Sequence, residues 1–513
     1  MKRSFPSAFV AFVLFAGLVA VPESMSAAQA SPGSSAVLQA HLLSAEGGDL
    51  GADLTGDDLI RALATARVAE DFRAMAEFRP GYPFWQHIFT IPDGSVAYGS
   101  AVDGRLLATF PASGDWVRGA RWEDPTLSSA LQGRSLERRV TARRDQVAEI
   151  LEPTVGPVVH NATRGRFLMP NVRQYGSFLE EWGLIYERFG VPAEIGIAQA
   201  ILESGLNGTI RSEAGAIGFC QWLPRNWDRM KQISPFEIEG HNQTTQAAYC
   251  AAYLTILATK YGSFIPALSE HHAGGSNVGR TVINGGRLGG QTAREQYFLG
   301  AEFARDLRTI SPTRFREVVR SYGPRSFLYA EMVFGNTFTV TQLTADVRQE
   351  PVHAMRASRN LPIADIAQRT GLSVDELRRY NPALIRQVPR GAALYLPFQV
   401  DAFGPDIAFW HRPADADFAA VLADFLRLDR SLLEWEDPAF ALVLREFRTR
   451  FTRTGSEEGM VMATVLQYVI GESYTGSRSD ILADFRSDPN ILRLVNEGIR
   501  ERQSLLGTSV TAR

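Results

Sequence analysis

Apolar residues recur three and four positions apart through most of the chain. This spacing places them on one face of an α-helix, so each stretch that shows it predicts a helix. The stretches are 59–76, 135–151, 171–189, 192–204, 244–261, 293–307, 418–428 and 460–470. We therefore expect a mainly α protein, with a smaller β component that makes the class α+β.

A segment near residue 100 has a different pattern. Three short runs rich in Ile, Val, Phe and Leu follow one another, and an Asp-Gly pair stands after each of the first two. Asp-Gly between apolar runs is typical of a tight hairpin turn. The runs at 86–91, 95–101 and 105–110 therefore predict a small three-stranded meander. It lies in an N-terminal region, 31–165, to which the pattern assigns no function.

Glycine-dotted segments separate several of the predicted helices. Two of them, 205–221 and 273–290, are interpreted as long loops, because loops held by a helical framework often border a cleft. The second lacks the Gly-Lys-Ser/Thr ending of a phosphate-binding loop. We expect it to form a mobile wall of the cleft. Helical patterns return in a C-terminal region, 401–513, whose function the pattern does not indicate.

The first thirty residues have the composition of a secretory signal peptide. Lys2 and Arg3 precede an apolar run at 8–21, and a small-residue site ends at Ala30. The run is shorter than the roughly 18 to 20 residues that span a bilayer. We expect cleavage after Ala30, no remaining transmembrane anchor, and a periplasmic location, with an uncleaved anchor as the alternative.

The balance of charged residues limits which kinds of molecule the chain can bind through its overall charge. The chain has 513 residues with 53 Lys and Arg against 56 Asp and Glu, a formal net charge of -3. This balance provides no general basic field for nucleic acid or for an anionic membrane surface. The 45% hydrophobic content is that of folded globular protein. We therefore expect several folded domains and no nucleic-acid partner.

Cys220 and Cys250 are the two cysteines of the chain. After export they would meet an oxidising compartment, where such a pair can form a disulfide. The alternative is two buried thiols that pack as small hydrophobes.

One carboxylate stands at the end of a nearly apolar helix. Pro192 suits the first position of this helix and Gly205 suits the position just after its end. The residues between them leave almost no polar face, which is typical of a helix surrounded by protein. Glu203 would therefore lie in apolar surroundings, where desolvation raises the pKa of a carboxyl group. Such a group can act as a general acid towards a sugar oxygen.

Four segments resemble, in order and spacing, the motifs of the soluble lytic murein transglycosylase family, whose catalytic domain is lysozyme-like. They are Glu203-Ser204, Gly218-Phe219-Cys220-Gln221, Glu270-His271-His272-Ala273-Gly274 and Tyr297-Phe298. The chain differs from the family's pattern where Cys220 replaces a methionine, where His271 and His272 replace Tyr and Asn, and where Glu270 replaces a small residue. A neutral imidazole can still donate or accept a hydrogen bond.

The resemblance implies a lysozyme-like domain at 166–325 that acts as a carbon–oxygen lyase on peptidoglycan glycan strands. It would cleave between N-acetylmuramic acid and N-acetylglucosamine without water. Glu203 would protonate the glycosidic oxygen and then accept the proton of the muramic 6-hydroxyl, which closes a 1,6-anhydro ring. No cofactor is implied. The residues implied to bind substrate are Ser204, Gly218, Phe219, Gln221, Glu270, His271, His272 and Tyr297.

Two alternatives remain open. A goose-lysozyme-like muramidase of the same fold would need a second carboxylate to activate water, and Glu270 and Glu213 are the candidates. A non-catalytic peptidoglycan-binding scaffold is the other. A metal site at His271 and His272 is not expected, because no ligand set surrounds them at suitable spacing.

Residues 350–400 resemble a LysM module, which binds peptidoglycan glycan. Two short helical segments, 361–370 and 373–380, precede a strand-like stretch at 392–397. The usual opening strand with Gly-Asp-Thr is missing. Glycan binding by this module and a purely structural role are equally compatible with the pattern.

Overall fold

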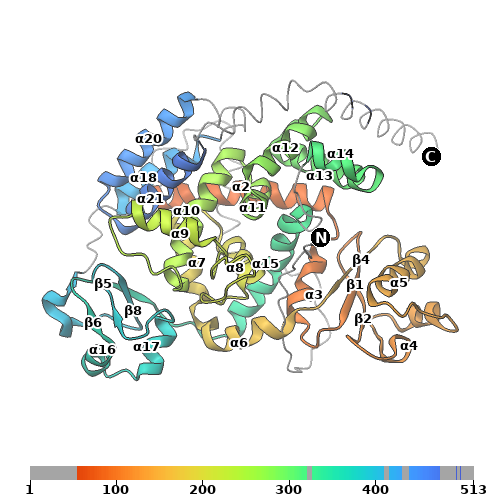
Figure 1. The fold of residues 1–513 in the computed structure, drawn as a ribbon, viewed down its shortest axis with the longest axis horizontal. Helices are drawn as coiled ribbons and strands as arrows, with labels where there is room; N and C mark the ends of the chain where they lie inside the picture. Colours follow the sequence, from red (N-terminus) through yellow and green to blue (C-terminus); the bar gives the residue numbers. More distant parts are fainter. Residues whose placement is uncertain are drawn as a thin grey trace, which may run out of the picture.

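The protein is described by a computed structural model that covers residues 55–319, 326–408, 415–429 and 438–473, with 493 and 497 as single residues. These residues are mainly helical, as predicted, and form three small antiparallel sheets (Figure 1). The predicted signal peptide, 1–30, lies outside the described residues. No helix within them is long and apolar enough to cross a membrane.

The N-terminal region begins with a long helix and continues into a sheet. Helix α2 (Gly56–Phe78) starts at a capping box formed by Thr55 and Asp58, which satisfies the first free backbone N–H groups. The sheet has strands β1 (Val96–Ser100), β2 (Leu106–Phe110), β3 (Arg121–Trp122) and β4 (Val158–Ala162), in the order β3-β2-β1-β4. Helices α4 (Trp116–Gly119) and α5 (Val140–Val155) accompany it, and α5 packs on β1 and β4. The predicted hairpin between 95–101 and 105–110 is confirmed.

The first strand of the predicted meander is wrong. Residues 86–91 belong mostly to helix α3 (Trp85–Thr90), which follows the 3-10 turn η1 (Tyr82–Phe84). Trp85, Ile88 and Phe89 are buried and stand three and four positions apart, so the short run has helical spacing. This face packs against helix α15 (Tyr329–Asp346), a contact that the local sequence does not indicate.

The central helices surround one buried helix, α8 (Ala193–Ser204). Helix α8 packs against α7 (Leu179–Arg188), α10 (Gln243–Tyr261) and α15. The predicted helix at 171–189 is broken near Gly176 into α6 (Gly165–Tyr175), a 3-10 turn and α7. The remaining helices of this part are α9 (Pro224–Ile233), α11 (Phe264–Ala273), α12 (Gly275–Arg287), α13 (Ala293–Ile310) and α14 (Pro312–Val318).

The predicted loop at 273–290 is wrong, because most of it is helix α12. Gly285 in this segment, and Gly300 on the neighbouring helix α13, allow the two helices to pack closely. A Cβ on Gly285 would overlap the backbone oxygen of Gln296 on α13, and a Cβ on Gly300 of α13 would overlap the backbone oxygen of Thr281. Glycine lets the two backbones approach closely, at a cost in helix propensity. The expected mobile wall is therefore a packed pair of helices.

Residues 353–396 form a compact βααβ module. Strand β5 (His353–Ala357) pairs antiparallel with β8 (Ala393–Leu396), and helices α16 (Ile363–Thr370) and α17 (Val374–Tyr380) lie between them in the chain. The two predicted helices and the final strand are confirmed as secondary structure. A strand that the sequence analysis did not predict, β5, precedes the two helices, and β9 (Ile407–Ala408) pairs with its other edge. The short strands β6 (Leu361–Pro362) and β7 (Gln387–Val388) form a separate ladder.

Polar contacts fix this module to the central helices. The Arg379 guanidinium donates to the backbone oxygen of Gln174 on α6 at 2.9 Å and lies 4.7 Å from the ring centre of Phe178. The hydroxyl oxygens of Tyr395 and Thr245 are 2.7 Å apart. The module and the N-terminal sheet lie on opposite sides of the central helices (Figure 1).

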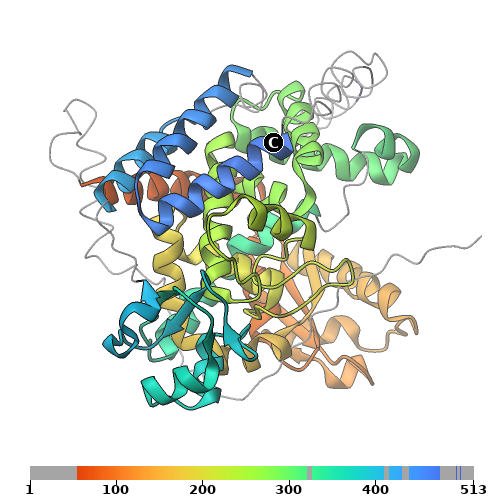
Figure 2. The same cartoon turned by 60° about the vertical axis from the view of Figure 1, so that its left-hand side comes forward.

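The C-terminal helices cover the central part from another side (Figure 2). Helix α18 (Asp415–Leu426) packs on α2, and α21 (Glu457–Ser473) packs on α9 and α10. Helix α20 (Pro438–Arg453) packs on α18 and α21. The helical predictions for 418–428 and 460–470 are confirmed. The C-terminal helices therefore pack directly on the helices of the central part.

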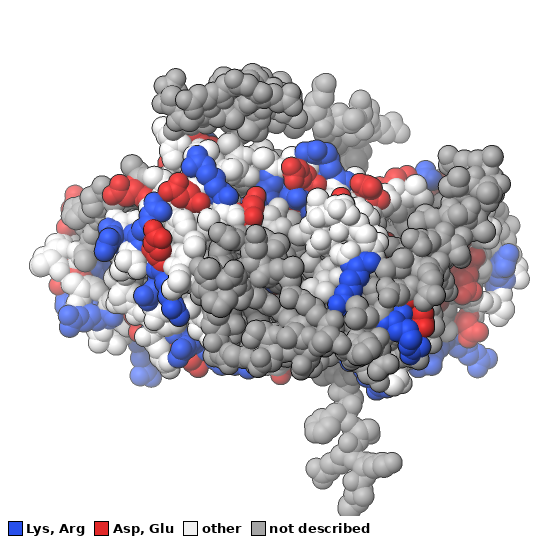
Figure 3. Space-filling model, turned by 90° about the horizontal axis from the view of Figure 1, so that it is seen from above, with Lys and Arg blue, Asp and Glu red and all other residues white. Residues whose placement is uncertain are grey.

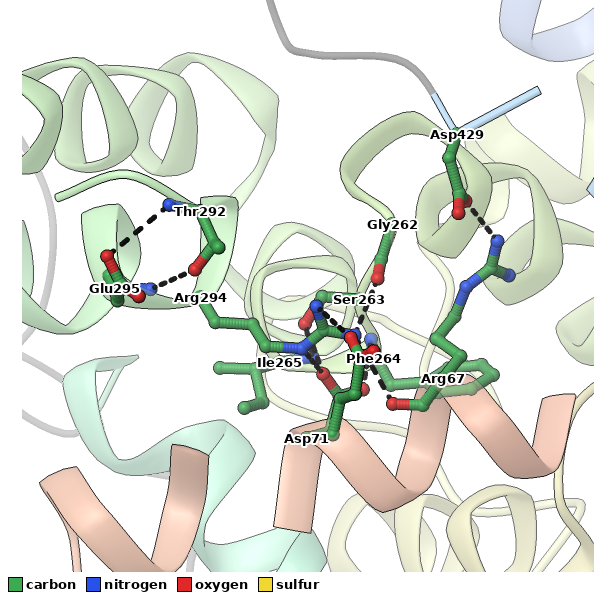
Figure 4. Close-up of polar contacts among 11 residues, drawn as sticks. Arg67, Asp71, Gly262, Ser263, Phe264, Ile265, Thr292, Arg294, Glu295 and Asp429 are labelled. Atoms are coloured by element: carbon green, nitrogen blue, oxygen red, sulfur yellow. Dashed lines mark hydrogen bonds and ion pairs between the residues drawn. The ribbon is translucent and has the colours of Figure 1, made fainter. Parts of the chain in front are cut away.

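A buried carboxylate joins three segments of the central part (Figure 4). The Asp71 side chain on α2 accepts hydrogen bonds from Ser263 Oγ and the Phe264 N–H, each at 2.7 Å, and from Arg294 Nε of α13. Ser263 is also the N-cap of α11. Asp71 thus fixes the start of α11 relative to α2 and α13.

Charged side chains are mixed on the surface. On the face shown in Figure 3, Lys and Arg alternate with Asp and Glu over the described residues. This distribution agrees with the near-balanced charge of the sequence.

Candidate active site

Glu203 stands in the last turn of α8, which packs against α7, α10 and α15. Gly205 ends the helix in the left-handed region with φ of 57°, as the sequence predicted, whereas Pro192 is the N-cap, one position before the predicted first helical residue. Ile195, Ile197 and Ile201 are fully buried, so the helix is surrounded by protein. The Glu203 side chain, in the last turn, is 13% exposed. The carboxyl group is thus largely removed from water but not sealed.

The surroundings of Glu203 favour its protonated form. Burial raises the pKa of this carboxyl group to about 7, because desolvation penalises the charged form. A hydrogen bond from the Tyr329 hydroxyl to Glu203 Oε1, 2.5 Å long, acts in the opposite direction. A carboxyl group with this pKa holds a proton on about half of the molecules at neutral pH, which suits both giving and accepting a proton.

Tyr329 is a site residue that the sequence interpretation missed. It begins α15, beyond the predicted boundary at 325, and its ring stacks on His272 with the ring centres 4.5 Å apart. Burial raises the pKa of Tyr329 well above its usual value, so the phenol remains a hydrogen-bond donor. The sequence offers no local signal for this contact, because it depends on how α15 packs on α8.

His271 lies near the same carboxylate oxygen as Tyr329. Its Nε2 is 3.9 Å from Glu203 Oε1 and 2.9 Å from the backbone oxygen of Cys220. A carbonyl oxygen only accepts, so the proton of the neutral ring is on Nε2. Burial lowers the pKa of His271 and of His272 to about 4 each. Both rings are therefore uncharged at neutral pH and do not favour ionisation of Glu203.

The segment 205–222 holds the motif residues in a tightly bonded turn. Gly218 has φ of 63°, and a Cβ there would overlap the backbone oxygen of Gly208 and the side chain of Gln246. Gln221 also has positive φ, and its amide donates to the Gly218 oxygen at 2.9 Å. Cys220 pairs with Cys250 as a disulfide, with the Cα atoms 6.2 Å apart.

Several residues predicted to bind substrate have other contacts in the structure. Ser204 Oγ donates to the Ala200 oxygen of its own helix at 2.9 Å. Phe219 is buried, with its ring centre 5.0 Å from that of Trp182. Tyr297 is 1% exposed, and its hydroxyl oxygen lies 2.7 Å from Ser269 Oγ. The structure therefore places Tyr329, and not Tyr297, beside Glu203.

The two candidates for a second carboxylate lie in contrasting surroundings. Glu270 is 3% exposed and forms an ion pair with Lys260, with Nζ 2.8 Å from Oε2, and it also accepts from the Tyr261 hydroxyl. Glu213 is exposed in the segment that follows α8. Of the predicted residues, the structure places His271 beside Glu203 directly, Cys220 through His271 and His272 through Tyr329.

Among the described residues, no three His, Cys, Asp or Glu side chains gather at distances that could hold a metal ion. No model of a known protein family matches the chain, and no curated protein is significantly similar to it.

Proposed function

We propose that the chain is a lytic transglycosylase that cleaves peptidoglycan between N-acetylmuramic acid and N-acetylglucosamine. The observation that carries the proposal is the Glu203 carboxyl group, which is 13% exposed at the end of a buried helix and has a pKa raised to about 7. A general acid works best when its pKa is close to the working pH.

The chemistry follows from the partners of this carboxyl group. Tyr329 donates to Oε1, which leaves Oε2 to carry the proton. Protonated Glu203 gives that proton to the glycosidic oxygen as the bond to the muramic C1 breaks, and an oxocarbenium-like centre develops there. The carboxylate then accepts the proton of the muramic 6-hydroxyl, whose oxygen bonds to C1. The Tyr329 hydrogen bond stabilises the carboxylate between the two steps.

The position of Glu270 favours a reaction without water over hydrolysis. An inverting hydrolase needs a second free carboxylate to activate water, about 6.5 to 9.5 Å from the acid. Glu270 is instead buried in an ion pair with Lys260 and bonded to Tyr261. Glu213 is exposed and not fixed by a described contact to Glu203. A single carboxylate that serves both steps agrees better with this arrangement.

Product analysis on purified sacculi tests the proposal. Mass spectrometry should find muropeptides that end in 1,6-anhydro-muramic acid, each lacking one water relative to the hydrolytic product. Glu203→Gln keeps the shape of the side chain and should lower the rate by about 10³-fold. Reducing-end products would instead establish a muramidase. Binding to sacculi without any cleavage would establish a scaffold.

We also propose that residues 353–396 form a LysM-like module that contacts the same glycan. The βααβ order of these residues supports this proposal. Exposed Ile385, Arg386 and Gln387 stand in the connection between α17 and β8. Replacing these three side chains with alanine in the full-length chain should weaken binding to sacculi and leave folding unchanged. Unchanged binding would assign the module a structural role. Export to the periplasm, the remaining expectation, is tested by cell fractionation.

A further inference from the structure

Helix α21 of the C-terminal part reaches the side of the active site. Its Tyr468 is 8% exposed, and its ring centre lies 6.4 Å from that of Trp222 and 6.3 Å from that of Tyr253. Trp222 follows the motif segment directly, and Tyr253 is on α10. Three segments separated by long stretches of sequence therefore meet in one set of rings.

The same rings pack around His271. The ring centre of His271 is 5.9 Å from that of Tyr253 and 6.4 Å from that of Trp222, and Trp222 and Tyr253 meet edge to face at 5.3 Å. We call Trp222, Tyr253, His271 and Tyr468 the aromatic cluster. His271 is the member that faces Glu203, at 3.9 Å from Oε1. Such ring contacts contribute to stability beyond the area that they bury.

We propose that Tyr468 is a positioning residue of the active site: its ring completes the aromatic cluster, which holds His271 against Glu203 and excludes water from that side. The inference rests on the proposed function. It assigns a role to the C-terminal part, for which the sequence indicated none. Tyr468 does not touch the carboxyl group and acts through Trp222, Tyr253 and His271.

The titratable groups near Glu203 are uncharged or paired at neutral pH, so the exclusion of water is the main influence on the pKa of Glu203. Tyr329 on α15 and His271 and His272 on α11 are uncharged at neutral pH, and so is Tyr186 on α7, whose pKa burial raises. Lys260 of α10 is paired with Glu270. Removing the Tyr468 ring should therefore act on Glu203 by admitting water, which favours the ionised form.

The test compares three variants of the full-length chain. In Tyr468→Ala, the pH at which kcat falls on the alkaline side should move down by about one unit, and kcat at pH 7 should fall by about 5-fold with KM changed much less. Tyr468→Phe keeps the ring and should behave as the wild type. Phe447→Ala removes a ring that packs on Phe425 within the C-terminal helices, and it should lower the melting temperature without moving the pH profile.

An unshifted profile in Tyr468→Ala, or an equal shift in Phe447→Ala, would overturn the inference while leaving the proposed function intact. If the wild type does not cleave sacculi, the proposed function fails, but the inference can still be measured. Carboxyl ¹³C resonances of glutamate-labelled protein, with Glu203 assigned from Glu203→Gln, should show a lower pKa for Glu203 in Tyr468→Ala. An unchanged pKa there would contradict the inference directly.

Discussion

The Tyr329 hydroxyl lies 2.5 Å from Glu203 Oε1, although 126 positions separate the two residues in the chain. The carboxyl group comes from the end of α8 and the phenol from the start of α15. The hydrogen bond is therefore made only when these two helices pack together. Proton affinity at this site is set by tertiary packing as much as by the motif that carries the glutamate.

Replacing Tyr329 by Phe should raise the pKa of Glu203 further. The variant loses a donor that stabilises the ionised carboxylate but keeps the ring that stacks on His272. We expect kcat to fall by about 10- to 100-fold, because a higher pKa makes Glu203 a weaker acid and the carboxylate left after proton donation loses a stabilising donor. The alkaline limb of the pH profile should move to higher pH. Muropeptide release across a pH series measures both.

Tyr297→Phe is the matched control for this variant. Its hydroxyl oxygen is next to Ser269 Oγ in the core, and the family resemblance had implied that Tyr297 orients substrate. The structure predicts that Tyr297→Phe changes kcat and KM by less than about twofold. A loss of activity comparable with that of Tyr329→Phe would show that the motif had identified the correct tyrosine.

Stability should depend on pH through Glu203. Its pKa is 4.5 in the reference state and about 7 in the folded protein, so between these values the unfolded chain binds fewer protons than the native state. Stability from this group is present below about pH 4.5 and is lost as the pH rises through about 7. Glu203→Gln cannot lose a proton, so between about pH 4 and pH 8 its stability relative to wild type should rise by about 3 kcal/mol.

Urea unfolding of both proteins at the two pH values measures this change. The lowered pKa of His271 also makes stability pH-dependent, but in the opposite direction: that contribution is lost as the pH falls from about 6.5 towards 4. It is present in both proteins and cancels in the difference. A difference in stability that is the same at both pH values would refute a buried, protonated Glu203.

Lys260→Met should be strongly destabilising. Glu270 would remain 3% exposed and lose the Lys260 cation, a loss that typically costs about 3 to 5 kcal/mol in a buried pair. Adding Glu270→Leu to this variant should recover most of the loss, because two apolar side chains replace the pair. Chemical denaturation of the single and double variants measures the coupling. If the double variant still cleaves sacculi to anhydro products, Glu270 takes no part in the reaction.

Gly218→Ala should disrupt the segment that carries Cys220. The residue has φ of 63°, and a Cβ would overlap the Gly208 backbone oxygen. We expect the free energy of unfolding to fall by more than about 2 kcal/mol and the catalytic activity to be lost. Gly371 provides a matched control, because its φ is 72° but no atom lies within 4 Å of the position of a Cβ. Gly371→Ala should cost about 1 kcal/mol and leave activity unchanged. Equal effects would show that backbone strain alone matters at Gly218.

The sequence predicted the position of Glu203 because the evidence for it is local. An apolar run between Pro192 and Gly205 defines both the helix and its burial, and the acid stands within that run. The 95–110 hairpin was predictable for the same reason, from Asp103-Gly104. Elements whose signals lie within a few residues are fixed before tertiary packing adds to them.

The predictions that failed depend on contacts between distant segments. Glycine in 273–290 indicated a loop, but the same residue type is also required where two helices approach closely, as Gly285 shows against Gln296. The apolar run at 86–91 fits either a strand or a short helix, and packing on α15 decides for the helix. Tyr329 carries no signal at all in its own neighbourhood, so it was outside the predicted domain.

The contribution of α15 has a practical consequence for anyone who wishes to move this activity into another protein. A gene fragment limited to residues 166–325 would encode the acid without the phenol that bonds to it, and without the α2 carboxylate that fixes α11. The predicted domain alone therefore does not contain the complete site. A transferred protein would need residues 55–346 together with α21, which carries Tyr468.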